Sequence, residues 1–547
     1  MKKYKLTTII AVVAMATLAF NSCVNDLNVT PLDKSVTTSN VTFTNTSAPY
    51  VSFLAKLYAG LATGGIQGAD NQVDITGYDG GSQAGYLRPL WNLQELPTDE
   101  AVCCWNDQTI QNFHNLSWTA SDIFLEAFYE RLYYQITVST AFLQQTTPAL
   151  LTARGVSQTL KDSITQFRAE ARFIRALAYF NVLDMYRNGP LVNDESQIGT
   201  ATPPPYGTSQ QIFNYIESEL TACQTDLMTP SIGFSATKYG HANKAAAWAL
   251  LARLYLNGNT YLGTSDNTFY TKCITNCNNV ISAGYQLEPI YQNIFVSDNY
   301  KSKEMIFPIV FDGSRLTSWG GMMFLMSSMV NGDIQALIAS PGGWGGNRAT
   351  QEFVARFNPP SGASYSLTDD SRFAMVYTGF AHPSIDDNSQ YKQGTPLIKY
   401  SEKNSSGITP NPLPSFPDTD FPLFRLGEVY LNYAEAVLRG GTGGSTVQAL
   451  TYVNNLRDRA FPLGNGEITS TQLTLPFILE ERAREMFSEA IRRTDLVRFG
   501  KLTDANYVWQ WKAGVKSGTG VPSYRNYYPI PNADLNANPN LKQNTGY

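Results

Sequence analysis

ILEERAREMFSEAIRRTDLVRFG, residues 478–500, is the most informative stretch of this chain. Apolar side chains recur along it at a spacing near 3.6, which predicts one long helix with a buried stripe. That stripe comprises Leu479, Ala483, Phe487, Ala490 and Ile491. Glutamate and arginine fill most other positions, several of them four residues apart, as is typical of a solvated face with ion pairs. Periodicity alone therefore predicts an exposed, charged helix near the C-terminus.

Residues 1–22 have the parts of a secretory signal peptide. A basic start is followed by a mostly apolar run from Leu6 to Phe20, which is too short for a stable membrane span. The run ends at Ser22-Cys23, and a small residue before a lone cysteine is where a lipoprotein signal peptidase cuts. We predict that Cys23 becomes a lipidated N-terminus, which anchors a protein without a transmembrane helix. Ordinary cleavage that leaves a free Cys23 is the alternative.

The composition argues against nucleic acid as a partner. The formal net charge is −5 at pH 7, and loss of the three leader lysines lowers it to about −8, a surface that repels phosphate. Aromatic residues make up 12% of the chain, with 31 tyrosines and 8 tryptophans, which indicates a surface that meets planar or sugar-like ligands. The remaining cysteines are irregularly spaced and predict no disulfide framework; they are Cys103, Cys104, Cys223, Cys273 and Cys277.

Helical patterns recur through the body of the chain, after a polar tether at 23–48. They lie at 49–62, 121–146, 161–186, 208–228, 241–257, 267–283, 423–439 and 446–460. A helix hairpin buries one face only against a neighbouring hairpin, so about four stacked, tetratricopeptide-like pairs are expected. Between about 284 and 422 the pattern changes to loops, short strands and irregular helices, and segments of that kind tend to be functional. We predict a single domain over 49–547.

The order of residues in the 478–500 stretch says more than its periodicity. Glu-Arg-x-Arg-Glu followed by Arg-Arg-x-Asp-Leu-x-Arg-Phe-Gly resembles the C-terminal signature of the SusD/RagB family, glycan-binding lipoproteins of the Bacteroidota cell surface. Further segments fall in the order of that family, so the resemblance covers nearly the whole chain. They are Leu-Pro-Thr-Asp-Glu (96–100), Arg-Ala-Glu-Ala-Arg-Phe-Ile-Arg-Ala (168–176), Pro-Asp-Thr-Asp-Phe-Pro-Leu-Phe-Arg-Leu (417–426) and Tyr-Pro-Ile-Pro (528–531).

This resemblance implies a fold, a location and a partner. The expected fold is dominated by α-helices, with tetratricopeptide-like pairs as scaffold and a loop-rich part, about 284–422, carrying the ligand site. The protein is expected on the outside of the outer membrane, where it delivers a glycan to a SusC-like TonB-dependent transporter. No cofactor and no metal ligand are expected, and structural calcium stays open.

Within the family, the chain is most similar to the starch-binding member, which binds helical α-glucan through an arc of aromatic side chains. The match implies ligand-binding roles for Trp105, Trp319, Trp344, Arg88, Asn106 and Gln108, and Asp79 in the loop 64–85 is a further candidate. Asn106 and Gln108 are alternatives for one polar position, because a one-residue gap falls there. Two departures leave a different glycan open: Cys103 replaces a further tryptophan, and the loop from 326 to 343 is shorter or different.

The chemistry of sugars explains why tryptophans far apart in sequence would converge. Sugar rings carry C–H faces that lie flat on indole, and tryptophan offers a large contact area at little conformational cost. Flanking arginine, asparagine and aspartate then hydrogen-bond the hydroxyls. Trp319 and Trp344 stand among glycine and serine, which favours a binding role. The others are predicted to be structural: Trp91, Trp118, Trp248, Trp509 and Trp511.

An enzyme is the weakest interpretation. A glycoside hydrolase needs paired carboxylates at a fixed separation, and the acidic pairs at 369–370 and 418–420 carry no specific motif. The three histidines, His114, His241 and His382, have no zinc spacing, and nucleophile-elbow, phosphate-loop and dinucleotide motifs are absent. The two alternatives to an α-glucan protein are a member of the same family for another glycan and a RagB-like, peptide-handling member.

Overall fold

The computed structural model describes residues 39–67, 71–361, 363, 365–380 and 382–547. The predicted signal peptide, Cys23 and most of the tether lie outside these residues. In the described part of the chain, no helix combines the length and the hydropathy that crossing a bilayer requires.

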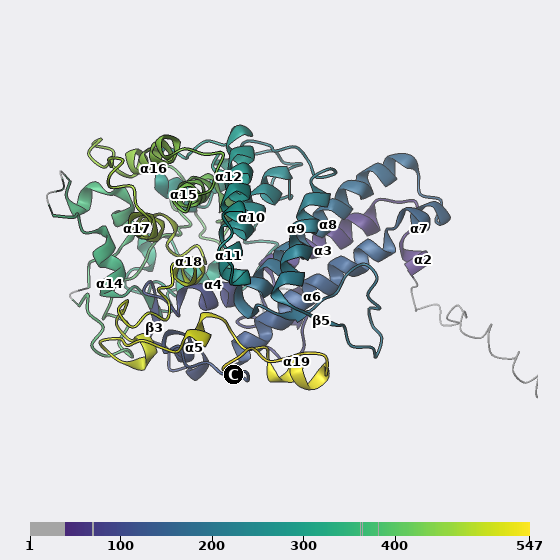
Figure 1. Cartoon of the computed structure of the whole chain (residues 1–547), viewed down its shortest axis with the longest axis horizontal. Coiled ribbons are helices and arrows are strands. Elements are labelled where there is room, and N and C mark those ends of the chain that lie inside the picture. Colours follow the sequence, from purple (N-terminus) through teal and green to yellow (C-terminus); the bar gives the residue numbers. More distant parts are fainter. Residues whose placement is uncertain (1–38, 68–70, 362, 364, 381) are drawn as a thin grey trace, which may run out of the picture.

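Long helices form one end of the scaffold (Figure 1). They are α3 (Ala48–Ala62), α6 (Ile123–Gln145), α8 (Gln158–Tyr186) and α9 (Ser209–Cys223), and α8 contacts each of the other three. Helix α9 begins with a capping box. Thr208 accepts from the backbone N–H of Gln211, whose side chain accepts from the backbone N–H of Thr208, so two unpaired donors of the first turn are satisfied.

A second group of helices continues the stack (Figure 1). It consists of α10 (Lys244–Leu256), α12 (Asn267–Ser282), α15 (Leu426–Leu438) and α16 (Thr446–Ala460). Helix α10 packs on α12, and α15 packs on α16, which are the two helix pairs expected from the sequence. Because α12 also packs on α15, the two pairs share a continuous core. The helix-dominated fold with paired helices is therefore confirmed.

Short elements connect this scaffold. The short helices are α2 (Ser39–Thr42), α4 (Leu87–Glu95), α5 (Gln108–His114), α7 (Pro148–Ala153), α11 (Gly258–Leu262), α13 (Met322–Ser327), α14 (Gln351–Val354) and α19 (Asn532–Ala537). The strands of the described residues pair as antiparallel ladders of two: β1 (Gly65–Gln67) with β2 (Asn71–Val73), β3 (Val102–Cys103) with β7 (Asn347–Arg348), β4 (Gly189–Pro190) with β5 (Tyr206–Gly207), and β6 (Met305–Ile309) with β8 (Phe421–Arg425). Between 284 and 422 only short elements occur in the described residues, as expected.

The prediction of one continuous helix over 478–500 is wrong. The stretch forms α17 (Leu475–Met486) and α18 (Arg492–Arg498), and the chain turns between them. Two non-glycine residues of the turn, Ser488 and Ala490, have positive φ angles of 58° and 57°, a conformation that such residues rarely adopt.

Two buried carboxyl groups from the other end of the chain hold this turn. Glu100 accepts the backbone N–H of Ser488 at 2.5 Å, and Glu95 accepts that of Ile491 at 2.9 Å. The backbone N–H groups that have no helical partner at the turn are thereby paired inside the core. An unpaired N–H group there would cost free energy of folding. Burial raises the pKa of Glu95 to about 8. The helix breaks because tertiary contacts satisfy the backbone better than helical continuation does.

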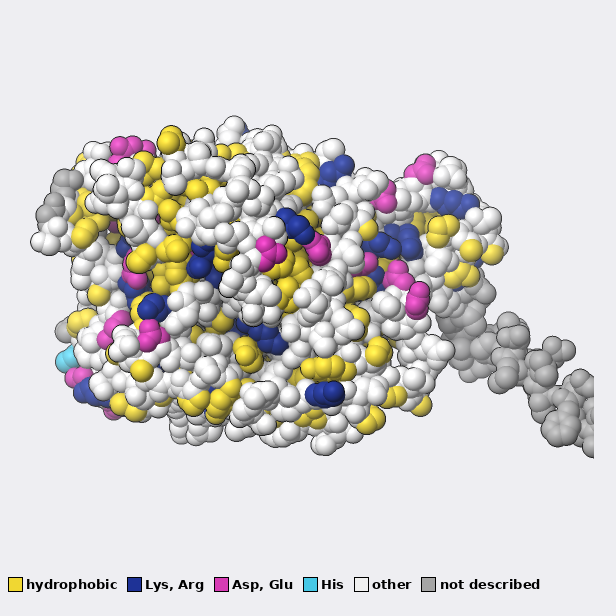
Figure 2. Space-filling view, in the orientation of Figure 1, with side chains coloured by type: hydrophobic (Ala, Val, Ile, Leu, Met, Phe, Trp, Pro, Cys, Tyr) yellow, Lys and Arg dark blue, Asp and Glu magenta, His cyan; other side chains and the backbone are white. Residues whose placement is uncertain are grey.

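The prediction of a solvated charged face is also wrong, because the charges are inside. Arg425 has no exposed surface and pairs with Glu304 at 2.9 Å, Glu485 at 2.7 Å and Glu489 at 2.7 Å. Arg372, equally buried, pairs with Glu485 at 3.0 Å. Charges are tolerated in an interior only when they are paired and hydrogen-bonded in this way. On the face in Figure 2, charged side chains appear only as small scattered groups.

The Leu-Pro-Thr-Asp-Glu segment is part of the same network. Asp99 accepts two hydrogen bonds from Arg492, both at 2.8 Å, in a bidentate pair. Burial alone would raise the pKa of Asp99, but Arg356 and Arg492 hold it well below its usual range. Sequence motifs 393 residues apart are thus joined in one buried cluster.

The C-terminal tail packs against the scaffold. The backbone N–H of Tyr528 donates to Met185 O at 2.8 Å, so the tail wraps back onto α8. All five described cysteines are free thiols. Cys273 and Cys277, one turn apart on α12, are buried with their sulfur atoms 4.0 Å apart, which is a packing contact.

Candidate functional site

The ladder of β3 and β7 brings two of the predicted tryptophans together. The strands are antiparallel, and Cys104 N donates to Gly346 O at 2.9 Å just beyond them. Trp105 follows β3 and Trp344 precedes β7, so the two segments that carry these residues lie side by side. Both side chains are half-buried.

Glycines around Trp344 give the segment Gly342–Gly346 its close packing. A Cβ on Gly346 would lie 2.3 Å from the indole of Trp105, and one on Gly342 would lie 2.8 Å from the hydroxyl of Ser327. Any larger residue would push Trp105 off the backbone that supports it. The glycines that marked this loop in the sequence therefore serve to seat an aromatic ring.

Trp319 completes the group of three, which we call the tryptophan site (Trp105, Trp319, Trp344). The ring centroids of Trp319 and Trp344 are 6.2 Å apart, with the ring planes inclined by 48°. The loop of Trp319 is fixed to the start of α4, because the backbone N–H of Arg88 donates to Gly320 O at 2.9 Å. Trp319 is also half-buried.

Arg88 lies under the tryptophan site. Its guanidinium carbon is 5.6 Å from the ring centroid of Trp105 and 4.6 Å from that of Phe324, a cation–π arrangement. Burial lowers the pKa of Arg88 to about 10, although the charges of Asp107 and Asp79 oppose that shift. Its Nε is buried without a hydrogen-bond partner. Arg88 thus has donor capacity that the described part of the protein does not use.

The polar candidate residues differ in whether their side chains already form hydrogen bonds within the protein. Asp79 is exposed at a turn, where its carboxylate accepts the backbone N–H of Gly81 at 2.7 Å. Gln108 donates along α5 to Asn112 at 2.8 Å. Asn106 is exposed, next to Trp105, and its amide has no partner among the described residues. Of the two alternatives, Asn106 is better placed to meet a ligand.

The other tryptophans have structural surroundings. Trp91, Trp118 and Trp509 are at most 1% exposed. Trp248 and Trp511 are half-buried, and their indole N–H groups donate to protein oxygen at 2.9 and 2.8 Å. No described residue accepts from the indole N–H of any member of the tryptophan site. The buried indole N–H groups of Trp91 and Trp509 are also unpaired, so it is partial exposure that sets the site tryptophans apart from these two.

Over 98% of its length, the chain is 32% identical to the "Starch-binding protein SusD" of Bacteroides thetaiotaomicron, of which 98% is covered. The chain belongs to the SusD family. The family model described as "SusD family" matches residues 387–547, and one described as "Starch-binding associating with outer membrane" matches 86–256.

Solved structures of the SusD family share the fold. A SusD superfamily protein of B. thetaiotaomicron superimposes with a TM-score of 0.69 at 19% identity, covering 91% of this chain and 99% of that one. The "Surface glycan-binding protein A" of the same species, in complex with laminarihexaose, gives a TM-score of 0.66 at 19% identity and covers 90% and 98%. A "SusD-like protein" of Bacteroides ovatus is 23% identical over 72% of this chain and 68% of its own length.

Sequence reasoning missed Phe416, an aromatic neighbour of the site in this SusD-family chain. The ring of Phe416 lies 4.8 Å from that of Trp319. Phe416 stands alone in a proline-rich loop, 409–417. An isolated aromatic residue without helical or strand periodicity was the available signal.

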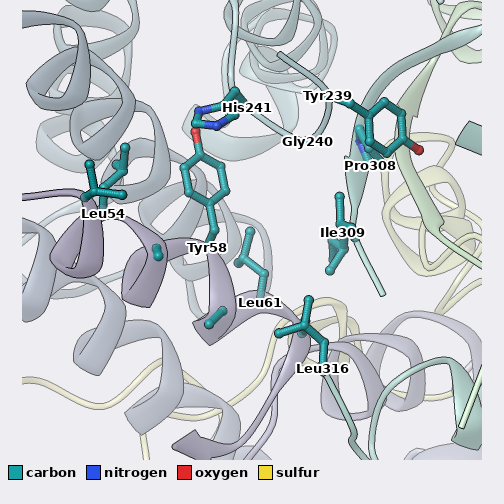
Figure 3. A pocket seen from close by; sticks show the side chains of 14 residues that line it. Leu54, Tyr58, Leu61, Tyr239, Gly240, His241, Pro308, Ile309 and Leu316 are labelled. Atoms are coloured by element: carbon teal, nitrogen blue, oxygen red, sulfur yellow. The ribbon is translucent and has the colours of Figure 1, made fainter. Parts of the chain in front are cut away.

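An apolar cavity lies between α3 and the end of β6 (Figure 3), and no member of the tryptophan site lines it. Its volume is about 410 Å³. The polar groups at its wall are already paired: His241 Nδ1 is 2.8 Å from the buried carboxylate of Glu170, which also accepts from Tyr58. The hydrogen bond to Glu170 raises the pKa of His241. A lining of this kind offers little to sugar hydroxyls.

No described residues form a constellation for metal binding. Among them, no group of three or more His, Cys, Asp and Glu side chains is placed to hold an ion. The tryptophan site itself combines flat apolar faces with unused donors and acceptors. Such a set of groups binds a ligand without covalent chemistry.

Proposed function

We propose that this SusD-family protein captures a glycan at the tryptophan site and does not cleave it. The observation that carries the proposal is the convergence of three half-buried tryptophans, with the guanidinium of Arg88 packed against the ring of Trp105. Indole faces match the C–H faces of sugars, and indole N–H groups without a protein acceptor match hydroxyls. The printed names of the relatives, one starch-binding and one solved with laminarihexaose, support the same class of ligand.

Starch-like α-glucan is the glycan that we favour. The planes of Trp319 and Trp344 are inclined by 48°, so their faces do not form a flat line. A curved α-1,4-glucan presents successive sugar faces at changing angles, whereas a straight β-glucan suits coplanar rings. The relative with 32% identity is named for starch binding.

A RagB-like role in peptide handling is the second candidate. Apolar side chains of a peptide would suit the cavity beside α3 better than the tryptophan site. Three convergent indoles with free N–H groups favour the glycan.

Affinity electrophoresis of the protein from residue 24 onward, against a glycan panel, tests the proposal. Gels that contain starch or pullulan should retard the protein, and gels with laminarin or cellulose derivatives should retard it less. Retardation by another glycan alone would show that the ligand is not α-glucan, and the proposed function of glycan capture would stand. Migration unchanged by every glycan would leave the peptide-handling role.

Attachment to the membrane gives a separate prediction. Cys23→Ala should abolish labelling by a palmitate analogue and release the protein from membranes, because acyl chains on that cysteine are the proposed anchor. Ser22→Ala, which keeps a small residue before the cysteine, is the matched control and should be labelled normally. Label that persists in the Cys23→Ala protein would show that the anchor is elsewhere.

The partner that we propose is a SusC-like TonB-dependent transporter in the outer membrane, on which the protein would act as a glycan-binding lid. The family description "Starch-binding associating with outer membrane" supports that location. A gentle detergent pulldown of the tagged, lipidated protein from native membranes should recover a TonB-dependent barrel. Recovery of the protein alone, under conditions that keep other outer-membrane complexes intact, would contradict this partner.

A further inference from the structure

Aromatic rings continue past the tryptophan site on the far side of Trp344. A Cβ on Gly345 would lie 3.3 Å from the ring of Tyr391. The ring centroid of Tyr391 is 5.7 Å from that of Phe380, which is 5.1 Å from that of Tyr377. We call Tyr391, Phe380 and Tyr377 the aromatic extension. Its members are half-buried, as the three tryptophans are.

The seat of the aromatic extension repeats the arrangement at Trp105. Gly345 has a φ of +56°, so glycine is favoured there, and its bare backbone receives the ring of Tyr391. The hydroxyl of Tyr391 donates to Met329 O at 2.7 Å, which fixes the ring. Thus Gly345 and Gly346, two neighbouring glycines, seat one ring of the extension and one ring of the tryptophan site.

Exposed polar groups accompany these rings. Lys392 Nζ is 5.9 Å from the ring centroid of Phe380 and pairs with Asp333 at 2.7 Å, and both side chains are more than half exposed. Asn331 donates to Asp333 at 3.0 Å, and its backbone bridges that of Trp344. Charged donors and acceptors therefore lie between Trp344 and Phe380, within reach of the hydroxyls of a chain that passes over the rings.

We propose that the glycan-binding surface runs from the tryptophan site along the aromatic extension, so that the ligand is a long polysaccharide chain rather than a short oligosaccharide. This inference rests on the proposed function and names the form of its substrate. The rings form two runs, Phe416–Trp319–Trp344 and Tyr391–Phe380–Tyr377. The two runs meet at the backbone of Gly345, next to Trp344. A short chain held at the tryptophans leaves the extension empty. A polymer gains contacts there without a second loss of rotational and translational freedom.

Calorimetry with maltoheptaose and affinity electrophoresis with amylopectin test the inference on the same variants. Phe380→Ala should keep its maltoheptaose affinity within about twofold and lose about tenfold for amylopectin. Trp344→Ala should weaken both. The matched control is Phe234→Ala, since Phe234 is an exposed phenylalanine outside both runs of rings, and it should change neither.

A melting curve for each variant shows whether the fold survives. Because Phe380 packs partly on the core, the exposed Lys392→Ala is the second variant, with no core contact to lose, and it should selectively weaken amylopectin binding. If Phe380→Ala and Lys392→Ala bind amylopectin as the wild type does while Trp344→Ala does not, the extension is wrong and the proposed function stands. If the wild type binds neither probe, both are overturned for α-glucans.

Discussion

Trp344→Ala should weaken the binding of maltoheptaose by about thirtyfold or more, which corresponds to about 2 kcal/mol. Trp344 lies at the centre of the site: its ring is 6.2 Å from that of Trp319, and its loop carries the glycine on which Trp105 rests. Removal of the indole takes away one sugar-stacking face and a free N–H donor. The fold should survive, because the ring is only partly buried.

Calorimetry on Trp105→Ala, Trp319→Ala and Trp344→Ala, each with a melting curve, separates the outcomes. Trp248→Ala is a matched control, since that half-buried indole lies on the scaffold and donates to Gln224. It should lower the melting temperature without a loss of affinity. Unchanged binding in all three site variants would place the ligand elsewhere. Lost binding together with loss of the cooperative melting transition would show that the rings support the fold.

Glu485→Gln should destabilise the protein by about 3–5 kcal/mol. The Glu485 carboxylate is fully buried and pairs with Arg425 at 2.7 Å, with Arg372 at 3.0 Å and with Arg459. The amide keeps the shape but removes the charge, which leaves these guanidinium groups buried with too few counterions. Urea unfolding followed by circular dichroism measures the change. Asp386→Asn, in an exposed pair with Lys516, is the control and should not shift the midpoint measurably.

The pH dependence of the same variant has a definite sign. Burial alone would raise the pKa of Glu485, but Arg459, Arg425 and Arg372 lower it from 4.5 to about 2. A depressed pKa means that the charged form stabilises the folded state. The contribution is complete above about pH 4.5 and disappears as the pH falls through about 2. The difference in free energy of unfolding between wild type and Glu485→Gln should therefore shrink across that window. A difference that stays constant would exclude ionised Glu485 as the cause.

Local periodicity predicted the scaffold but not the turn within the signature stretch. Helices such as α8 and α10 follow from apolar spacing, which each segment carries by itself. The positive φ angles at Ser488 and Ala490 depend on carboxyl groups almost four hundred residues earlier in the chain. No window around the turn contains that information. Likewise, the glutamates and arginines of α17 have the spacing of an exposed helix, and only the partners on other segments show that they are buried.

The candidate site divides in the same way. Tryptophans among glycines were visible in the sequence, and the family resemblance selected three of them. Phe416 was missed because its ring neighbour, Trp319, lies on a distant segment. The aromatic extension was missed because Tyr391 reaches the tryptophan site only through Gly345, on another segment. The choice between Asn106 and Gln108 needed the side-chain bond from Gln108 to Asn112. Residue type indicated the chemistry, and pairing of segments determined which residues share a surface.

The salt bridge between Asp99 and Arg492 bears on how the chain acquires its structure. Stacked helix pairs normally fold and can be shortened unit by unit, because each unit contacts only its neighbours. Here, the carboxylate of Asp99 lacks its bidentate partner until a segment 393 residues later arrives. Early helices can form, but the interior cannot close before the last tenth of the polypeptide is present. A C-terminal truncation before Arg492 should therefore be unfolded and sensitive to protease. Only a chain that extends beyond Arg492 can reach the folded state.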